Sequence, residues 1–283
     1  MTEKNRFKTF SITLITVWLV IFVLLPTLMG FAVSLMTSNT PGEISPVFTL
    51  NNYKALKDPV FIQVMADSFE MAFITTILCL LVGYPFAYNL SKYKGKFKTL
   101  LLVFIIIPFW TSSLIRTYAI IVIIKTNGVL NNILMFLGII DEPLRLMYTE
   151  SAVLVGMVYS LLPFMILPLY AVLEKLDYKL IEAAKDLGAG RMRTFFHVVL
   201  PLSMPGVIAG SMLVFLPTLC LFYISDVLGG AKSLLIGNFI RNQFLLTRNW
   251  PLGAAASMIL TVIMFVIIYV YYRSTKQTGR DAI

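Results

Sequence analysis

Long apolar runs separated by short polar connections dominate the chain. Hydrocarbon cannot satisfy exposed backbone groups, so a spanning helix needs about 20 mainly apolar residues. Six segments meet this requirement: 10–36, 69–90, 100–124, 152–173, 207–228 and 253–272. The first follows basic residues, as a signal peptide would, but it exceeds the roughly 7–15 apolar residues of such a peptide, so we interpret it as a retained span. The pattern predicts an all-α integral membrane protein whose six transmembrane helices form one domain over residues 1–283.

Two further features of the pattern bear on a transport pathway. The segment 130–140 is apolar but has only about eleven residues, so we expect an interfacial or re-entrant helix there, with a plain loop as the alternative. Four prolines lie inside the predicted spans: Pro108, Pro163, Pro168 and Pro217. Kinked spans suit a gated pathway, although structural helices carry prolines too.

Basic residues are distributed unequally between the two sides of the predicted bundle. Fifteen lysines and arginines flank the spans on the side that holds the termini, and seven lie on the other side. Lysine and arginine are enriched in cytoplasmic loops. Both termini are therefore expected to face the cytoplasm.

The composition excludes several classes of protein. The chain is 58% hydrophobic and 13% charged, which is too apolar for a soluble fold of this length. Cys79, Cys220 and His197 are too few for a thiolate or histidine metal site, so neither a metal nor a cofactor is expected. The net charge of +9 is explained by membrane topology rather than by nucleic acid. Nothing resembles a catalytic nucleophile–base pair, and no phosphate-binding G-x-x-x-x-G-K-[ST] loop occurs, so the chain is not an ATPase.

The connection 174–205 predicts two short helices joined by a turn. Asp177 is a suitable N-cap for the first helix, and Gly188 fits the left-handed position that ends it. A second helix is expected from about Arg191 until Pro201 stops it. One face of the first helix would be apolar and would carry Leu180, Ile181, Ala184 and Leu187.

This connection resembles the signature of permease subunits of binding-protein-dependent ABC importers. The signature is EAA, three residues, Gly, nine residues, then I-x-L-P, with valine here in place of isoleucine. The matching residues are Glu182, Ala183, Ala184, Gly188, Val198, Leu200 and Pro201. The resemblance implies a coupling helix that docks on an ATPase, with Glu182 holding it there and Gly188 setting the turn. The alternative is an amphipathic surface hairpin without a partner.

The whole chain resembles the spermidine/putrescine (polyamine) permease subfamily, and in particular the first of its two permease subunits. The segments that carry this similarity are 50–53, 83–87, 108–116, 182–201, 222–230 and 249–251. The resemblance implies a type I ABC importer permease fold in the bacterial cytoplasmic (inner) membrane. It implies four kinds of partner: a second permease subunit that is a different chain, two ATP-binding subunits, an extracytoplasmic polyamine-binding protein and the polyamine itself.

A polyamine passing through a bilayer needs carboxylates and aromatic faces, because a desolvated ammonium group is costly. Trp110, Tyr118 and Tyr223 are candidate faces along the pathway, and Ser225 and Asp226 are candidate oxygen ligands. The alternative for the aromatic residues is an interfacial belt.

Arg116 lies inside an apolar span, where ionisable residues are rare and usually paired. Spacing along the helices places Arg116, Glu70 and Asp226 at similar depth. An ion pair of Arg116 with Glu70 or Asp226 is therefore expected, and the sequence does not choose between them.

The rival functions are a permease for another small organic solute and an ATP-independent secondary transporter. A homodimer is the alternative to the heterodimer.

Overall fold

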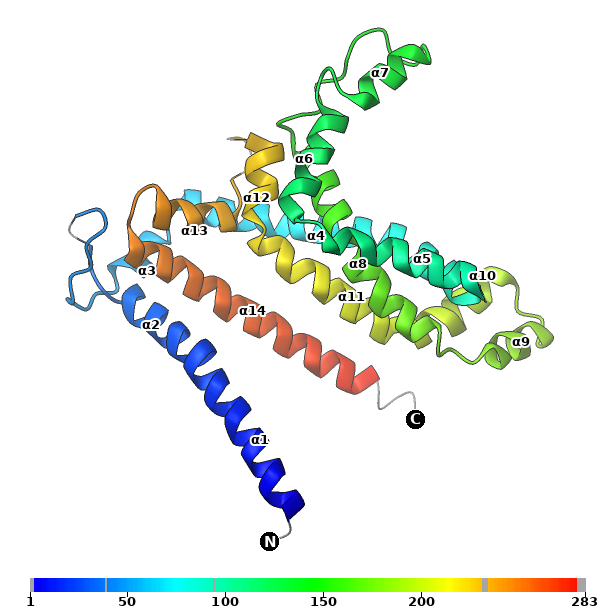
Figure 1. Ribbon diagram of the computed structural model, residues 1–283, viewed down its shortest axis with the longest axis horizontal. Coiled ribbons are helices and arrows are strands. Elements are labelled where there is room, and N and C mark those ends of the chain that lie inside the picture. The colour runs from blue at the N-terminus through cyan, green and yellow to red at the C-terminus, as the bar shows by residue number, and fades with distance from the viewer. Residues whose placement is uncertain (1–2, 39, 94, 231–233, 279–283) are drawn as a thin grey trace. The chain divides into compact units, whose positions relative to one another are not determined.

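The computed structural model describes residues 3–38, 40–93, 95–230 and 234–278 (Figure 1). The described residues are helical apart from their connections and one isolated bridge between Thr37 and Ser45. The helices are α1 (Glu3–Leu19), α2 (Leu25–Ser34), α3 (Asn51–Ala55), α4 (Pro59–Lys92), α5 (Lys96–Ile106), α6 (Ser113–Ile124), α7 (Val129–Phe136), α8 (Glu150–Leu173), α9 (Tyr178–Asp186), α10 (Arg191–Thr194), α11 (Leu200–Cys220), α12 (Phe222–Ile224), α13 (Ile236–Leu245) and α14 (Trp250–Thr278).

Irregular helical turns interrupt or join some of these elements. A 3₁₀ turn follows α5, and π-helical turns lie between α1 and α2, between α10 and α11, and after α12. Their bounds are η1 (Val20–Leu24), η2 (Ile107–Trp110), η3 (Phe195–Val199) and η4 (Ser225–Gly229).

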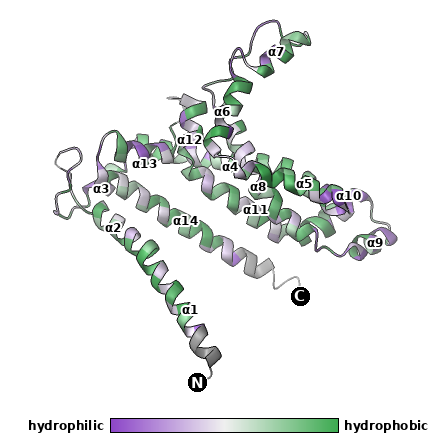
Figure 2. Ribbon diagram, in the orientation of Figure 1, coloured by the Kyte–Doolittle hydropathy of each residue, from purple (hydrophilic) through white to green (hydrophobic). Residues whose placement is uncertain are grey.

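Six helical segments in the described residues are long and apolar enough to cross a membrane, which confirms the predicted number. They are Lys8–Ser34, Pro59–Lys92, Ser113–Phe136, Glu150–Leu173, Arg191–Cys220 and Trp250–Arg273. Figure 2 shows that the long helices are hydrophobic over most of their length, whereas hydrophilic residues gather on α9 and α10.

The chain forms two compact units, of which the first comprises Met1–Gln63 and Phe239–Phe265. In this unit, Tyr53 on α3 hydrogen-bonds through its hydroxyl to Ser34 Oγ at 2.7 Å, and Asn52 Nδ2 donates to the carbonyls of Ser34 and Met36. These bonds hold the short helix α3 against the end of α2. The apolar side chains of the first span are largely exposed, which suits contact with lipid.

The second unit comprises Val64–Asn238 and Val266–Ile283, and α4, α8 and α11 form its main core. Gly206 and Gly210 on α11 face the backbone of α8 at close range: a Cβ at Gly210 would lie 3.0 Å from the carbonyl oxygen of Met165. A Cβ at Gly83 on α4 would similarly lie 3.1 Å from Met165 Cγ. Small residues four apart allow membrane helices to approach closely, so these glycines determine how the core packs.

A second core cluster joins α6 and α8 to the segment after α11. Ile120 and Ile124 on α6 pack with Val153 and Met157 on α8 and with Ile224 on α12. This cluster positions α12 and η4, which hold three of the candidate pathway residues.

The third predicted span is interrupted in the structure. Instead of one helix over 100–124, α5 ends at Ile106, η2 follows, and Thr111 is extended (φ −92°, ψ 145°) before α6 begins. Pro108 explains the break, because proline supplies no N–H and clashes with the preceding helical turn. The helix of the fifth predicted span, α11, also ends earlier than expected: it ends at Cys220, and Leu221 leaves the helical conformation (ψ 84°).

Two predictions for the connections have different outcomes. The segment 130–140 does contain a helix, α7, and the buried amide of Asn131 ties it to the carbonyls of Thr126 and Leu144. The prediction that Pro201 stops a helix is wrong, because helical turns continue from α10 through η3 into α11. Pro201 lies in the first turn of α11, where a missing N–H is tolerated, and the π-helical turn directly before it shifts the hydrogen-bond pattern.

Candidate functional site

The connection between α8 and α11 folds as two local capping signals predict. Asp177 caps α9 by accepting a hydrogen bond from the backbone N–H of Lys179 at 3.0 Å. Gly188 ends α9 in the left-handed region (φ +81°). The N–H of Ala189 then donates to the Ala184 carbonyl and the N–H of Gly188 to the Lys185 carbonyl, which is the Schellman arrangement.

The helix α9 presents its signature residues outward and buries one anchor. Ile181 is buried in the main core, whereas Glu182 and Ala183 are exposed. Of the apolar face that the sequence predicts, Leu180 is 48% and Leu187 89% exposed. An exposed glutamate, a small alanine and a projecting leucine on one short helix form a surface suited to docking in a groove of a partner.

The remaining signature residues lie where α11 begins. Leu200 is partly buried against the main core and Pro201 is exposed. The signature therefore extends from the exposed helix α9 into the first turn of a membrane-spanning segment. Movement imposed on α9 has a direct covalent route into α11.

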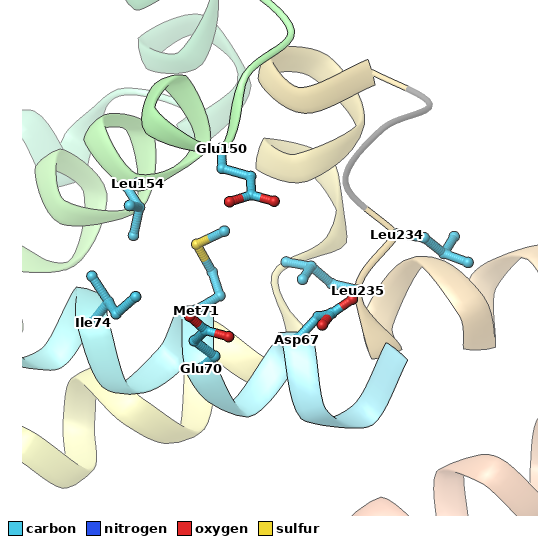
Figure 3. Close-up of a pocket in the computed structure, with 8 residues that line it drawn as sticks. All are labelled: Asp67, Glu70, Met71, Ile74, Glu150, Leu154, Leu234 and Leu235. Carbon is cyan, nitrogen blue, oxygen red and sulfur yellow. The ribbon is translucent and has the colours of Figure 1, made fainter. Parts of the chain in front are cut away.

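A hollow at the opposite end of α4 from this connection brings together three carboxylates. Asp67 and Glu70 lie on α4 and Glu150 begins α8. The cavity measures about 100 Å³, and its apolar lining comprises Met71, Ile74, Leu154, Leu234 and Leu235. In Figure 3, Glu150 extends from α8 toward Met71, which lies between it and Glu70.

Sequence reasoning identified Glu70 but missed this hollow. Glu150 follows Glu70 by 80 positions and lies on another helix, so no local pattern connects them. The sequence offers one signal for the hollow: Asp67 and Glu70 are three positions apart and therefore share one face of a helix.

The candidate pathway residues occupy two places in the second unit. Trp110 is 85% exposed at the break between α5 and α6, and Tyr118 is exposed on α6. Tyr223, Ser225 and Asp226 follow one another on α12 and η4, where Ser225 is fully buried and Asp226 accepts a hydrogen bond from Asn238 Nδ2. The structure thus brings the last three together and places Trp110 at a separate, irregular part of the backbone.

The structure does not form the expected ion pair of Arg116. Its Nε and Nη1 atoms are buried without a hydrogen-bond partner among the described residues, and its guanidinium lies 5.6 Å from the ring of Phe109. Glu70 lies instead beside Asp67 in the hollow. A cation–π contact therefore takes the place that the sequence assigned to a carboxylate.

An ion pair outside the spanning segments joins the start of α5 to the end of α8. Lys98 Nζ donates to Glu174 Oε1 at 2.6 Å. This hydrogen bond lowers the pKa of the Glu174 carboxyl and raises the pKa of the Lys98 ammonium. Both groups therefore stay ionised over a wider pH range, and the bridge links the start of α5 to the end of α8.

Comparison with known proteins identifies the family. The model described as "Binding-protein-dependent transport system inner membrane component" matches residues 80–278. The spermidine/putrescine transport system permease protein PotB of Salmonella typhimurium (strain LT2) is 49% identical over 276 residues, which cover 98% of this chain and 96% of that protein. PotB of Escherichia coli (strain K12) is 51% identical over 259 residues, covering 92% and 94%.

Solved structures support the fold. A bacterial ABC transporter involved in the import of the acidic polysaccharide alginate has a chain that matches with a TM-score of 0.75 and 17% identity, covering 97% of this chain and 96% of that one. The same coverage, with a TM-score of 0.77 and 16% identity, is found for the alginate transporter in complex with its pentasaccharide-bound periplasmic protein. At such low identity the likeness concerns the importer permease fold alone. From the family match and the near-full-length similarity to PotB, this chain belongs to the binding-protein-dependent transport system inner membrane components.

Proposed function

We propose that this chain is the permease subunit of an ATP-driven importer that moves polyamines, spermidine and putrescine among them, into the cytoplasm. The observation that carries the proposal is the 49–51% identity, over nearly the whole chain, to spermidine/putrescine permeases. The similarity extends over 92–98% of this chain, so it includes the membrane-spanning helices as well as the signature connection.

The proposed assembly has five subunits. A second permease of different sequence completes the pathway, two ATP-binding subunits dock on α9, and an extracytoplasmic polyamine-binding protein delivers the substrate. The excess of basic residues beside α9 and the termini supports a cytoplasmic position for both. ATP-driven closure would act on Glu182, Ala183, Ala184 and Gly188, pass through Leu200 and Pro201, and switch the cavity by alternating access.

The hollow suits the chemistry of a polyamine. Spermidine carries ammonium groups separated by apolar methylene segments, and the hollow combines three carboxylates with leucine, isoleucine and methionine walls. Carboxylates attract the ammonium groups, and the apolar walls contact the methylene spine. Trp110, Tyr118 and Tyr223 would provide aromatic faces further along the path, and Ser225 and Asp226 oxygen atoms.

Uptake of labelled spermidine by liposomes that hold the complete assembly tests the proposal. We expect uptake that requires both ATP on the ATPase side and the binding protein outside, and that excess putrescine inhibits. ATP hydrolysis stimulated by the binding protein without spermidine uptake would retain the importer and reject the polyamine. Uptake without ATP would instead indicate a secondary transporter.

Neutralising the hollow in the triple variant Asp67→Asn, Glu70→Gln, Glu150→Gln is expected to raise the KM for spermidine uptake about tenfold, since partly exposed ion pairs contribute about 0.2–1 kcal/mol each. Putrescine has fewer charges and should be affected less. The measurement is initial uptake rate against substrate concentration at low ionic strength, where screening is weakest.

Glu142→Gln is the matched control, because this exposed glutamate lies outside the hollow on the connection before α8. Its KM should equal that of the wild type. An unchanged KM in the triple variant would show that spermidine does not contact these carboxylates.

A further inference from the structure

A cluster of aromatic rings joins the segment after α9 to the helix α4. The ring of Phe195, the first residue of η3, lies 5.5 Å from that of Tyr84 and 6.1 Å from that of Tyr88, with interplanar angles of 84° and 78°. Both are edge-to-face contacts, the arrangement that ring quadrupoles favour. Phe195 is thus seated between two tyrosines that lie one turn apart on α4.

This contact is part of a buried connection rather than a surface contact. The Tyr84 hydroxyl hydrogen-bonds to Ser203 Oγ on α11 at 2.7 Å, and both residues are buried. Phe195 itself packs against the main core, to which Ile181 of α9 also belongs. The segment from α9 to α11 therefore contacts α4 at a defined place and cannot slide freely past it.

The two tyrosines bracket Pro85, which lies inside α4. Proline removes one helical hydrogen bond, here to the carbonyl of Leu81, so α4 bends more easily at this level than elsewhere. At the other end of α4, Glu70 lies about 21 Å along the helix axis from Tyr84 at about 1.5 Å per residue. A small tilt at Pro85 therefore becomes a larger displacement of the α4 side of the hollow.

We propose that Phe195 is a positioning residue that transmits movement of α9 to α4, so that ATP-driven closure of the ATPase subunits displaces Asp67 and Glu70 relative to Glu150 on α8. This inference rests on the proposed function and extends it, by assigning a route between the coupling helix and the hollow. When α9 is pushed, η3 moves with it, and the ring of Phe195 carries Tyr84 and Tyr88 along. The outer part of α4 then tilts about Pro85, and the carboxylates of the hollow separate.

Phe195→Leu removes the ring but retains an apolar side chain, and Phe196→Leu is the matched control. Phe196 is the next residue, is 52% exposed, and contacts the ring of Phe195 rather than either tyrosine. In the complete reconstituted importer, Phe195→Leu is expected to lower spermidine uptake per ATP hydrolysed about tenfold, because two edge-to-face ring contacts are lost. Phe196→Leu should keep the wild-type ratio, and the ATPase should copurify with both variants.

A second measurement does not depend on the substrate. Spin labels at Ala66→Cys on α4 and Ser151→Cys on α8, both exposed positions, report the separation of the two sides of the hollow in a Cys220→Ser background. We expect ATP binding to change this separation in the wild type and in Phe196→Leu but not in Phe195→Leu.

The outcomes separate the two proposals. An ATP-dependent change of separation that Phe195→Leu abolishes supports the route through Phe195, even if the assembly fails to take up spermidine, which would reject the polyamine alone. Equal separations and equal uptake ratios in the two variants would overturn the role of Phe195. A proportional loss of assembled protein, hydrolysis and uptake in Phe195→Leu would also overturn it, because it would indicate a purely structural residue.

Discussion

Replacing Glu182 with alanine, or Gly188 with leucine, is expected to abolish ATP-driven uptake while the chain remains in the membrane. Glu182 is exposed on α9, so we expect its loss to act on the ATPase subunit that is proposed to dock there rather than on the core. Truncating one partner of a buried, hydrogen-bonded charge pair costs about 2–5 kcal/mol, which predicts a loss of coupling of about thirtyfold or more. Leucine at position 188 is strained because the backbone there is left-handed (φ +81°), which disfavours any side chain with a Cβ.

The measurement is uptake and ATP hydrolysis in the same liposomes, together with copurification of the ATPase. Lys185→Ala is the control, since this exposed residue lies on the same helix outside the signature. Normal uptake by Glu182→Ala or Gly188→Leu would show that α9 is not the coupling element.

Gly210→Leu is expected to prevent the second unit from reaching its folded packing. A Cβ at this position would lie 2.8 Å from Met165 Sδ, 3.0 Å from the Met165 carbonyl oxygen and 3.3 Å from its Cα. The sulfur could move, but the backbone of α8 cannot without separating α8 from α11. Overpacking typically costs about 1–3 kcal/mol when side chains can adjust, and more is expected here.

The yield of monodisperse protein in detergent and its thermal midpoint measure this effect. Gly190→Ala is the control, because a Cβ at Gly190 meets nothing within 4 Å and its φ is not positive. Equal yield and thermal midpoint for the two variants would contradict the close approach of α8 and α11.

Local signals explain what the sequence predicts well. Six apolar segments of sufficient length are visible without any knowledge of packing, since lipid imposes the same requirement on each one separately. The ends of α9 depend on Asp177 and Gly188, whose effects extend over a single helical turn, and both residues act as predicted. The signature at 182–201 is likewise recognised from residue types at fixed spacing along the chain, without knowledge of the packing.

Features that depend on tertiary packing could not be predicted from the sequence. Glu150 joins Asp67 and Glu70 because α8 begins beside α4, and the contact of Phe195 with Tyr84 spans 111 positions. The pairing expected for Arg116 assumed that similar depth implies contact, whereas the rotation of each helix decides which side chains meet. The sequence predicts that Pro201 ends a helix because proline usually does so, and the π-helical turn that lets the helix continue has no recognisable sequence pattern.

The break between α5 and α6 has a consequence for how the chain enters the bilayer during synthesis. With 11 residues, α5 is far shorter than the roughly 20 residues that cross the hydrocarbon alone, whereas the apolar segment that begins with α6 continues to Phe136. We expect that the insertion machinery cannot release α5 into lipid when it emerges, and that it retains α5 until α6 follows. The irregular turn at Pro108 thereby makes α5 and the segment that begins with α6 a single unit of insertion, so that the polar backbone of the turn enters the membrane together with the helices on either side of it.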